Sequence, residues 1–224
     1  MDTQMRLDID HKTTLAVFAL VAATLSVLLL AASLVPPPAS PSELLALASG
    51  HRGAYGGFAS LVLAWAVFSV PLIATLGELL RPHGGTLAAI AQLLSAIGVL
   101  LLAFAIFTHI GAVLAIADAS GSARGQDATY QAAIWSRLGF YLTDPGLMTW
   151  GLGQFLFGWI AWRSVVLPRW VAIVGMIGGL AGLLTLAVYQ TSVLALVQLA
   201  CFTVWGFATG IALLRARRSR LAAA

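Results

Sequence analysis

The chain has 224 residues, of which 60% are hydrophobic and only 9% charged, and its formal net charge is +4 at pH 7. A soluble domain carries about 25% charged residues, because it must cover itself with polar groups. The composition therefore excludes a water-soluble globular protein and predicts an all-α integral membrane bundle. The single cysteine, Cys201, also excludes a disulfide framework within the chain.

Six apolar runs are long enough to cross a membrane, since about 20 helical residues span about 30 Å of hydrocarbon. We expect six transmembrane helices within one domain that covers residues 1–224. Their predicted ranges are 14–35, 53–80, 86–117, 138–162, 170–188 and 193–214. The first run carries no charge and exceeds the apolar core of a signal peptide, so we expect it to be a retained helix.

The first three connections contain helix-breaking or capping residues. Pro36-Pro37-Pro38 should end the first helix, and residues 42–52 predict a short surface helix capped by Ser42. Residues 81–85, which read Arg-Pro-His-Gly-Gly, predict a tight turn. Within the second span, Pro71 predicts a kink.

Later in the chain, residues 118–137 predict the one outer loop of any size, with a short helix at 128–136. Residues 189–192 predict a hairpin between the last two spans.

The distribution of basic residues predicts the orientation, because cytoplasmic segments of membrane proteins are enriched in Lys and Arg. With the N-terminus inside, the outer segments hold three basic residues: Arg52, Arg124 and Arg137. The inner segments hold the other nine: Arg6, Lys12, Arg81, Arg163, Arg169, Arg215, Arg217, Arg218 and Arg220. We therefore expect both termini in the cytoplasm and a location in the plasma (inner) membrane.

Glycines at a spacing of four predict where helices approach each other closely, which is a main source of helix association in lipid. We expect these glycines to pack helices of the same chain rather than a second copy. The pairs are Gly175 with Gly179, Gly178 with Gly182, Gly53 with Gly57, and Gly206 with Gly210.

Ionisable groups inside a membrane are costly and suggest functional sites. His109, Asp144, Arg137 and His51 all fall near the predicted outer boundary, so we expect them to line an outer ligand pocket. No spacing such as H-E-x-x-H accompanies them, and we predict no metal site. The cofactor is left open.

Three neutral polar residues fall within the spans, namely Gln92, Gln154 and Gln198. They either line a polar path or join helices by hydrogen bonds, and the second role is the more common one.

The turn before the fifth span reads Leu167-Pro168-Arg169-Trp170 and is followed by Gly175 and by Gly178-Gly179. This segment resembles an uncharacterised bacterial family of six-span membrane proteins that is classed as a domain of unknown function. The family carries an I/L-P-R-W turn before its fifth span. The resemblance implies the six-span layout and brings no known activity.

These features favour a non-enzymatic multi-pass module. We expect it to contact the bilayer and to bind a small apolar or amphipathic ligand or a membrane-protein partner, and we expect no nucleic acid partner. A small transporter or channel is the first alternative, since Pro71 and the three glutamines offer a bendable helix and a polar path. The second is a membrane enzyme or metal protein that uses His109, His51, Asp118 and Asp144 on the outer face.

Overall fold

The computed structural model describes residues 3–33, 40–120, 125–164, 166–185 and 192–222, with side chains described within residues 13–215 except near the gaps and at position 140. The described residues form seven helices and confirm the all-α prediction. These are α1 (Thr3–Ser33), α2 (Pro41–Gly50), α3 (Arg52–Gly84), α4 (Thr86–Ser120), α5 (Gly125–Ser164), α6 (Arg169–Leu184) and α7 (Ser192–Ala222).

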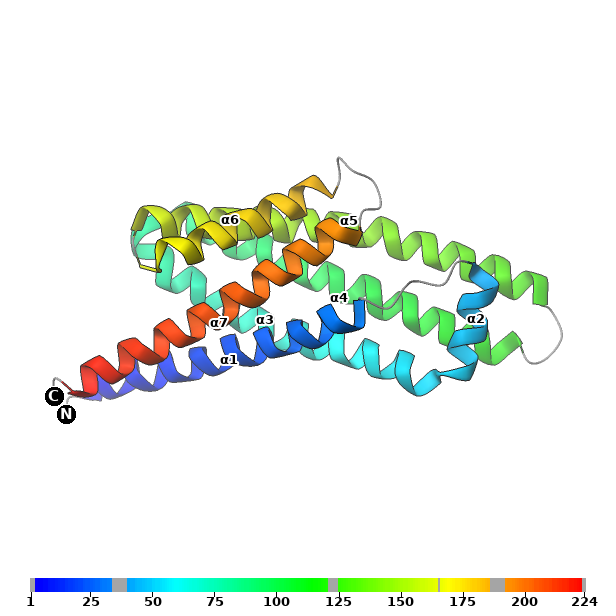
Figure 1. Ribbon diagram of the computed structural model, residues 1–224, viewed down its shortest axis with the longest axis horizontal. Helices are drawn as coiled ribbons and strands as arrows, with labels where there is room; N and C mark the ends of the chain where they lie inside the picture. The colour runs from blue at the N-terminus through cyan, green and yellow to red at the C-terminus, as the bar shows by residue number, and fades with distance from the viewer. Residues whose placement is uncertain (1–2, 34–39, 121–124, 165, 186–191, 223–224) are drawn as a thin grey trace.

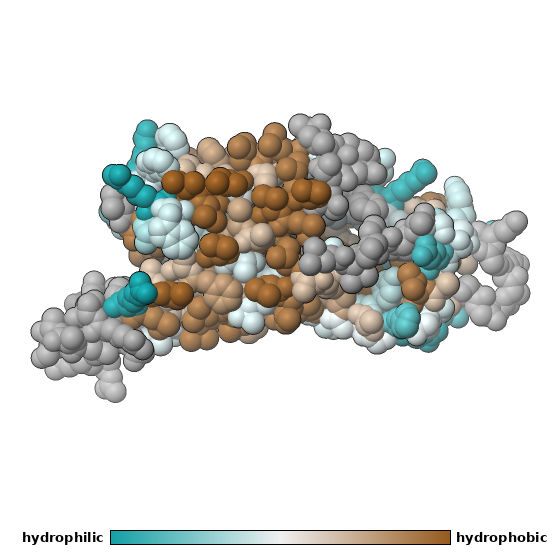
Figure 2. Space-filling model, viewed as in Figure 1, coloured by the Kyte–Doolittle hydropathy of each residue, from teal (hydrophilic) through white to brown (hydrophobic). Residues whose placement is uncertain are grey.

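The six longer helices run roughly along one axis, and short α2 lies across the end of α4 and α5 (Figure 1). The start of α1 and the end of α7 lie together at the opposite end, with the α3–α4 and α5–α6 connections (Figure 1). Apolar side chains form a belt over α1, α6 and α7, while hydrophilic residues gather beyond it near α2 (Figure 2). The end that carries α2 is called the α2 end below.

Four helical segments in the described residues are long and apolar enough to cross a membrane: Thr13–Ser33, Arg52–Gly84, Thr86–Asp118 and Val193–Arg215. They match the first, second, third and sixth predicted spans, so the chain is a multi-pass membrane protein. The fourth predicted span lies within α5, and α6 covers the fifth predicted span as far as Leu184. However, glycines, tryptophans and Gln154 lower the hydropathy of α5, and α6 has only 16 residues.

The prediction of an outer loop at residues 118–137 is wrong for most of that range. Helix α4 continues to Ser120 and α5 begins at Gly125, so the short helix expected at 128–136 is the first part of α5. Ala128 and Ala132 pack against α2 there. The polar sequence is therefore one face of a helix whose other face is buried.

The short helix expected at residues 42–52 is confirmed as α2, but its N-cap is wrong. Ser40 caps α2, with its hydroxyl oxygen 3.2 Å from the amide nitrogen of Glu43, and Pro41 occupies the first helical turn. The expected turn at residues 81–85 is shorter than predicted, because α3 continues to Gly84. Only Gly85, at φ +49°, separates α3 from α4, and this left-handed conformation favours glycine.

Helix α3 runs through Pro71 without a break, and the hydroxyl of Thr75 donates to the carbonyl oxygen of Pro71 at 2.7 Å. Pro36-Pro37-Pro38 and Tyr189-Gln190-Thr191 lie outside the described residues, so the helix end and the hairpin expected there stay predictions. Ser192 begins α7.

The glycine seams predicted on α6 and α7 pack helices of the same chain. A Cβ added at Gly179 would lie 2.6 Å from the carbonyl oxygen of Gly151, so the backbones of α5 and α6 are in contact. On the other flank, a Cβ at Gly206 would lie 3.1 Å from that of Ala23 in α1. The pair of Gly53 and Gly57 is different: both glycines are exposed, and a Cβ added at either would meet nothing within 4 Å.

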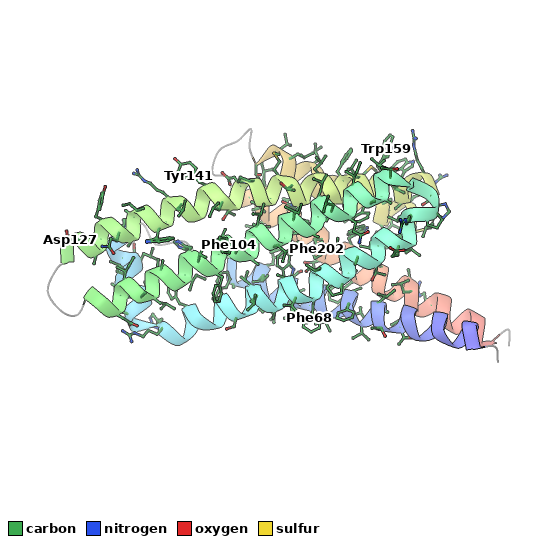
Figure 3. The ribbon with its side chains drawn as sticks, turned by 180° about the vertical axis from the view of Figure 1, so that it is seen from behind. Phe68, Phe104, Asp127, Tyr141, Trp159 and Phe202 are labelled. Carbon is green, nitrogen blue, oxygen red and sulfur yellow. The ribbon has the colours of Figure 1, made fainter. Side chains whose placement is uncertain are left out.

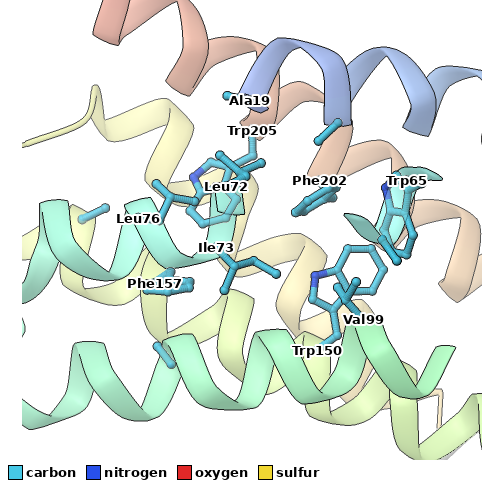
Figure 4. Packing of buried hydrophobic residues seen from close by; sticks show 14 of the residues in the cluster. Ala19, Trp65, Leu72, Ile73, Leu76, Val99, Trp150, Phe157, Phe202 and Trp205 are labelled. Carbon is cyan, nitrogen blue, oxygen red and sulfur yellow. The ribbon is translucent and has the colours of Figure 1, made fainter. Parts of the chain in front are cut away.

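Aromatic side chains fill the middle of the bundle. Trp65, Trp150 and Phe202 form a triangle of edge-to-face contacts, with ring centroids 5.0, 5.4 and 6.0 Å apart (Figure 4). Such pairs add about 0.5–1.5 kcal/mol each beyond burial. The indole nitrogen of Trp65 also donates to the hydroxyl of Ser26 at 2.8 Å. These contacts join α1, α3, α5 and α7 at one point in the bundle.

Candidate binding cavity

A cavity of about 530 Å³ opens among α3, α4 and α5 toward the α2 end. Its wall is mostly apolar and includes a few hydroxyl groups and one imidazole. The lining residues are Ala32, Leu44, Ala54, Tyr55, Phe58, Ala105, Ile106, His109, Ile110, Ser136, Gly139 and Thr143. This space is called the outer cavity below.

A second cavity of about 230 Å³ lies next to it and reaches the aromatic triangle. The two cavities share Phe58, Ile106 and Thr143 in their walls, so they adjoin at these three side chains. The second space is called the inner cavity. Its other lining residues are Leu29, Ser33, Val62, Trp65, Leu102, Leu147, Trp150, Ala195, Leu196 and Leu199.

The imidazole of His109 is the polar ring in the wall of the outer cavity. Its Nδ1 lies 3.3 Å from the carbonyl oxygen of Trp135 in α5. A carbonyl only accepts hydrogen bonds, so Nδ1 carries the proton, and Nε2 of the neutral ring then carries a lone pair. Gly139 makes room for this ring, because a Cβ there would lie only 3.1 Å from that of His109.

Hydroxyl groups supply the rest of the polar wall. The hydroxyl of Thr143 donates to the carbonyl oxygen of Gly139 at 2.7 Å, and its oxygen retains lone pairs that accept. Ser136 and Tyr55 add two more hydroxyl groups. The outer cavity therefore offers hydrogen-bonding groups within an apolar wall.

Of the four outer-face candidates, only His109 lines either cavity. Asp144 is half-buried on α5, seven residues before Gly151, and so shares the face of α5 that approaches α6. Arg137 is exposed, and so is His51 between α2 and α3. The structure does not gather the four side chains around one space.

Asp118, the acidic residue named in the enzyme alternative, forms an exposed ion pair near the α2 end. Arg52 at the start of α3 pairs with Asp118 near the end of α4, and both side chains are 57% exposed. Among the described residues, no three His, Cys, Asp or Glu side chains are grouped so as to hold a metal ion.

The three glutamines line neither cavity. Gln92 lies beside Gly77, where an added Cβ would be 2.7 Å from its Cδ. Gln198 is fully buried, and its Nε2 donates to the carbonyl oxygen of Leu147 at 3.2 Å. Gln154 is 1% exposed, and both of its amide atoms lack a hydrogen-bond partner among the described residues. Gln154 and Gln198 therefore lie in the seams among α5, α6 and α7.

Sequence reasoning missed Tyr55, Ser136 and Thr143. One signal was present, because Ser136, Gly139 and Thr143 recur at intervals of three and four residues and so share one face of a helix. The prediction put Ser136 in a short helix at 128–136 and the other two residues in a separate span at 138–162, so the continuous face was missed. Figure 3 shows the length of α5, with Asp127 and Trp159 toward opposite ends and Tyr141 pointing away from the bundle.

A family model for a domain of unknown function, DUF4386, matches residues 13–217. The chain belongs to the DUF4386 family. The predicted resemblance to a membrane family of unknown function is confirmed in this respect, and the match covers the cavity-lining residues. No curated protein and no solved structure matches this DUF4386 chain. The family description assigns no activity.

Proposed function

We propose that this DUF4386 protein is a non-enzymatic membrane module whose outer cavity binds a small apolar or amphipathic molecule. The observation that carries the proposal is the apolar outer cavity of about 530 Å³ with His109 in its wall. Ligand pockets commonly measure about 300–1,000 Å³ and combine apolar walls with a few placed polar groups. The outer cavity has this size and this composition.

We also propose that the chain forms one domain that crosses the plasma (inner) membrane six times with both termini in the cytoplasm. The terminal ends of α1 and α7 lie together, as an even number of crossings requires (Figure 1). The end of the bundle that holds these termini also carries four arginines: Arg81, Arg163, Arg169 and Arg215. The positive-inside rule then supports a cytoplasmic location for that end and an outer location for the α2 end.

The positions of the glutamines favour ligand binding over transport. A polar route through the membrane needs polar side chains along a cavity wall. Gln154 and Gln198 are buried against the glycines of α6 instead, where added Cβ atoms at Gly178 and Gly182 would lie 2.6 Å from their amide atoms.

Native mass spectrometry of protein extracted gently from its own membrane tests the proposal. The key variant is Ile106→Trp, because Ile106 lines both cavities and a larger side chain fills the space where they adjoin. Phe107→Trp is its matched control, since the neighbouring Phe107 is half exposed on another face of α4.

We expect a small molecule to stay bound to the wild type and to Phe107→Trp and to be lost from Ile106→Trp. The proposal fails if no small molecule is retained by any form, or if retention is equal in all three. A protein subunit bound in place of a small molecule would instead favour the membrane-partner hypothesis.

A further inference from the structure

We propose that the ligand is a single-chain amphipath with an uncharged, hydrogen-bond-donating head group. Its head lies at His109 in the outer cavity, and its hydrocarbon chain extends through the inner cavity to Trp150. This inference rests on the proposed function and adds the chemical class and the orientation of the ligand.

The two cavities differ in the kind of polar group that their walls carry. The outer cavity holds the hydroxyl-bearing side chains of Tyr55 and Ser136 and the imidazole of His109. Aliphatic and aromatic side chains dominate the wall of the inner cavity, and the indole N–H of Trp65 already donates to Ser26. The inner cavity also has two hydroxyl groups, those of Ser33 and Thr143, and each donates to a carbonyl oxygen of its own helix. The imidazole and the phenol lie in the outer cavity alone, so a polar head has more hydrogen-bonding groups there and a chain fits the inner cavity.

The length of the joined space fits one chain. Ser136 lines the outer cavity and Trp150 the inner one, and they are fourteen residues apart on α5. At 1.5 Å per residue this corresponds to about 21 Å. One leaflet of a bilayer is about 15 Å of hydrocarbon, half of the full thickness. The space therefore accommodates one lipid chain and a compact head, and the small inner volume of about 230 Å³ favours one chain over two.

The lining of the outer cavity selects an uncharged head. It contains no Lys, Arg, Asp or Glu among its described residues. A carboxylate or phosphate head that entered it would lose hydration without gaining a positive charge from the wall, which is strongly unfavourable. Arg52, the nearest arginine in sequence to Tyr55, is paired with Asp118.

The position of the proton on His109 favours a head group that donates a hydrogen bond. Its Nδ1–H is directed at the Trp135 carbonyl oxygen, so Nε2 is the atom that offers a lone pair. The oxygen of Thr143 accepts as well, because its own proton is donated to Gly139. Two acceptors in an apolar wall favour a head that carries hydroxyl groups.

The test uses three probes that share one chain brominated at its methyl end. Their heads are glycerol (a monoacylglycerol), carboxylate (a fatty acid) and phosphocholine (a lysolipid). Bromine quenches nearby indoles, so tryptophan fluorescence of the purified protein reports both affinity and chain position. We expect the monoacylglycerol to bind about tenfold more tightly than the charged and zwitterionic probes. Trp150→Phe should lose part of the quenching.

Variants of His109 test the head position. His109→Phe should weaken the binding of the monoacylglycerol and remove the difference in affinity among the three heads. His109→Gln should retain part of this difference, because its carbonyl oxygen reaches the position of Nε2. Thr108→Val is the matched control, since Thr108 donates to Phe104 within its own helix and lines neither cavity. If His109→Phe does not fold, the affinities of the three probes for the wild type and for His109→Gln still test the head position.

Equal affinity for the three heads would overturn this inference and leave the proposed function standing. Quenching that Trp150→Phe does not reduce would overturn the orientation. If no probe binds and native mass spectrometry also finds no retained molecule, the proposed function fails as well.

Discussion

The imidazole of His109 in α4 lies with Nδ1 3.3 Å from the main-chain carbonyl oxygen of Trp135 in α5. This contact links the two longest helices near the α2 end and orients the ring in the wall of the outer cavity. Main-chain carbonyls commonly fix the tautomer of a histidine in this way.

The contact predicts the proton position in His109. With ¹⁵N-labelled histidine, NMR should show the Nδ1–H tautomer for this ring, because only a protonated nitrogen donates to a carbonyl. The His109→Gln variant identifies the signal by removing it. A proton found on Nε2 would contradict the hydrogen bond and the acceptor assigned to the cavity.

Gly179 gives a sharp test of the helix packing. Gly179→Ala should lower the free energy of unfolding by about 2 kcal/mol, because its Cβ would meet the α5 backbone, which cannot rotate away. Gly57→Ala is the control, and there an added Cβ meets nothing within 4 Å. Alanine's higher helix propensity should make that variant neutral or slightly more stable. Thermal unfolding in detergent measures both, and equal losses would argue against the α5–α6 seam.

The two buried glutamines should respond differently to methionine, a side chain of similar shape. Gln198→Met should cost about 0.6 kcal/mol or somewhat more, because it removes a hydrogen bond to the Leu147 carbonyl. Gln154→Met should be neutral or stabilising, since neither amide atom has a partner among the described residues. A large loss of stability for Gln154→Met would show that its amide makes a contact that the described residues do not contain.

The orientation is tested with single cysteines in a Cys201→Ser background. Ser49 in α2 and His83 near the end of α3 are both exposed. Helix α2 and the connection between α3 and α4 lie at opposite ends of the molecule (Figure 1). A membrane-impermeant maleimide should label Ser49→Cys in intact cells and His83→Cys only after permeabilisation. The reverse pattern would invert the proposed topology.

Apolar segments were the part of the fold that the sequence predicted well. Runs such as residues 86–117 are apolar because lipid is their solvent, and their length follows from the bilayer. The extension of α5 before residue 138 was missed because its residues are polar. Ala128 and Ala132 form a buried face only once α2 lies against them, and a contact between distant segments leaves no local signal.

The site was predicted only from the depth of residues in the membrane, and this explains why His109 lines the cavity while the other three candidates do not. His109 and Asp144 both fall near the outer boundary. However, the depth of a residue in the membrane does not determine the direction in which its side chain points from the helix. Adjacent residues point about 100° apart, so Thr143 lines both cavities whereas Asp144 does not. Which face of a helix lies against its neighbours depends on the glycine contacts between helices, such as that of Gly151 with Gly179.

The most direct test of the binding cavity is an electron cryomicroscopy map of the wild-type protein in a nanodisc made from its own membrane lipids. We predict elongated density that begins beside His109 and extends past Ile106 to Trp150, with no protein side chain to account for it. A map in which protein side chains close the space between His109 and Trp150 would contradict the account.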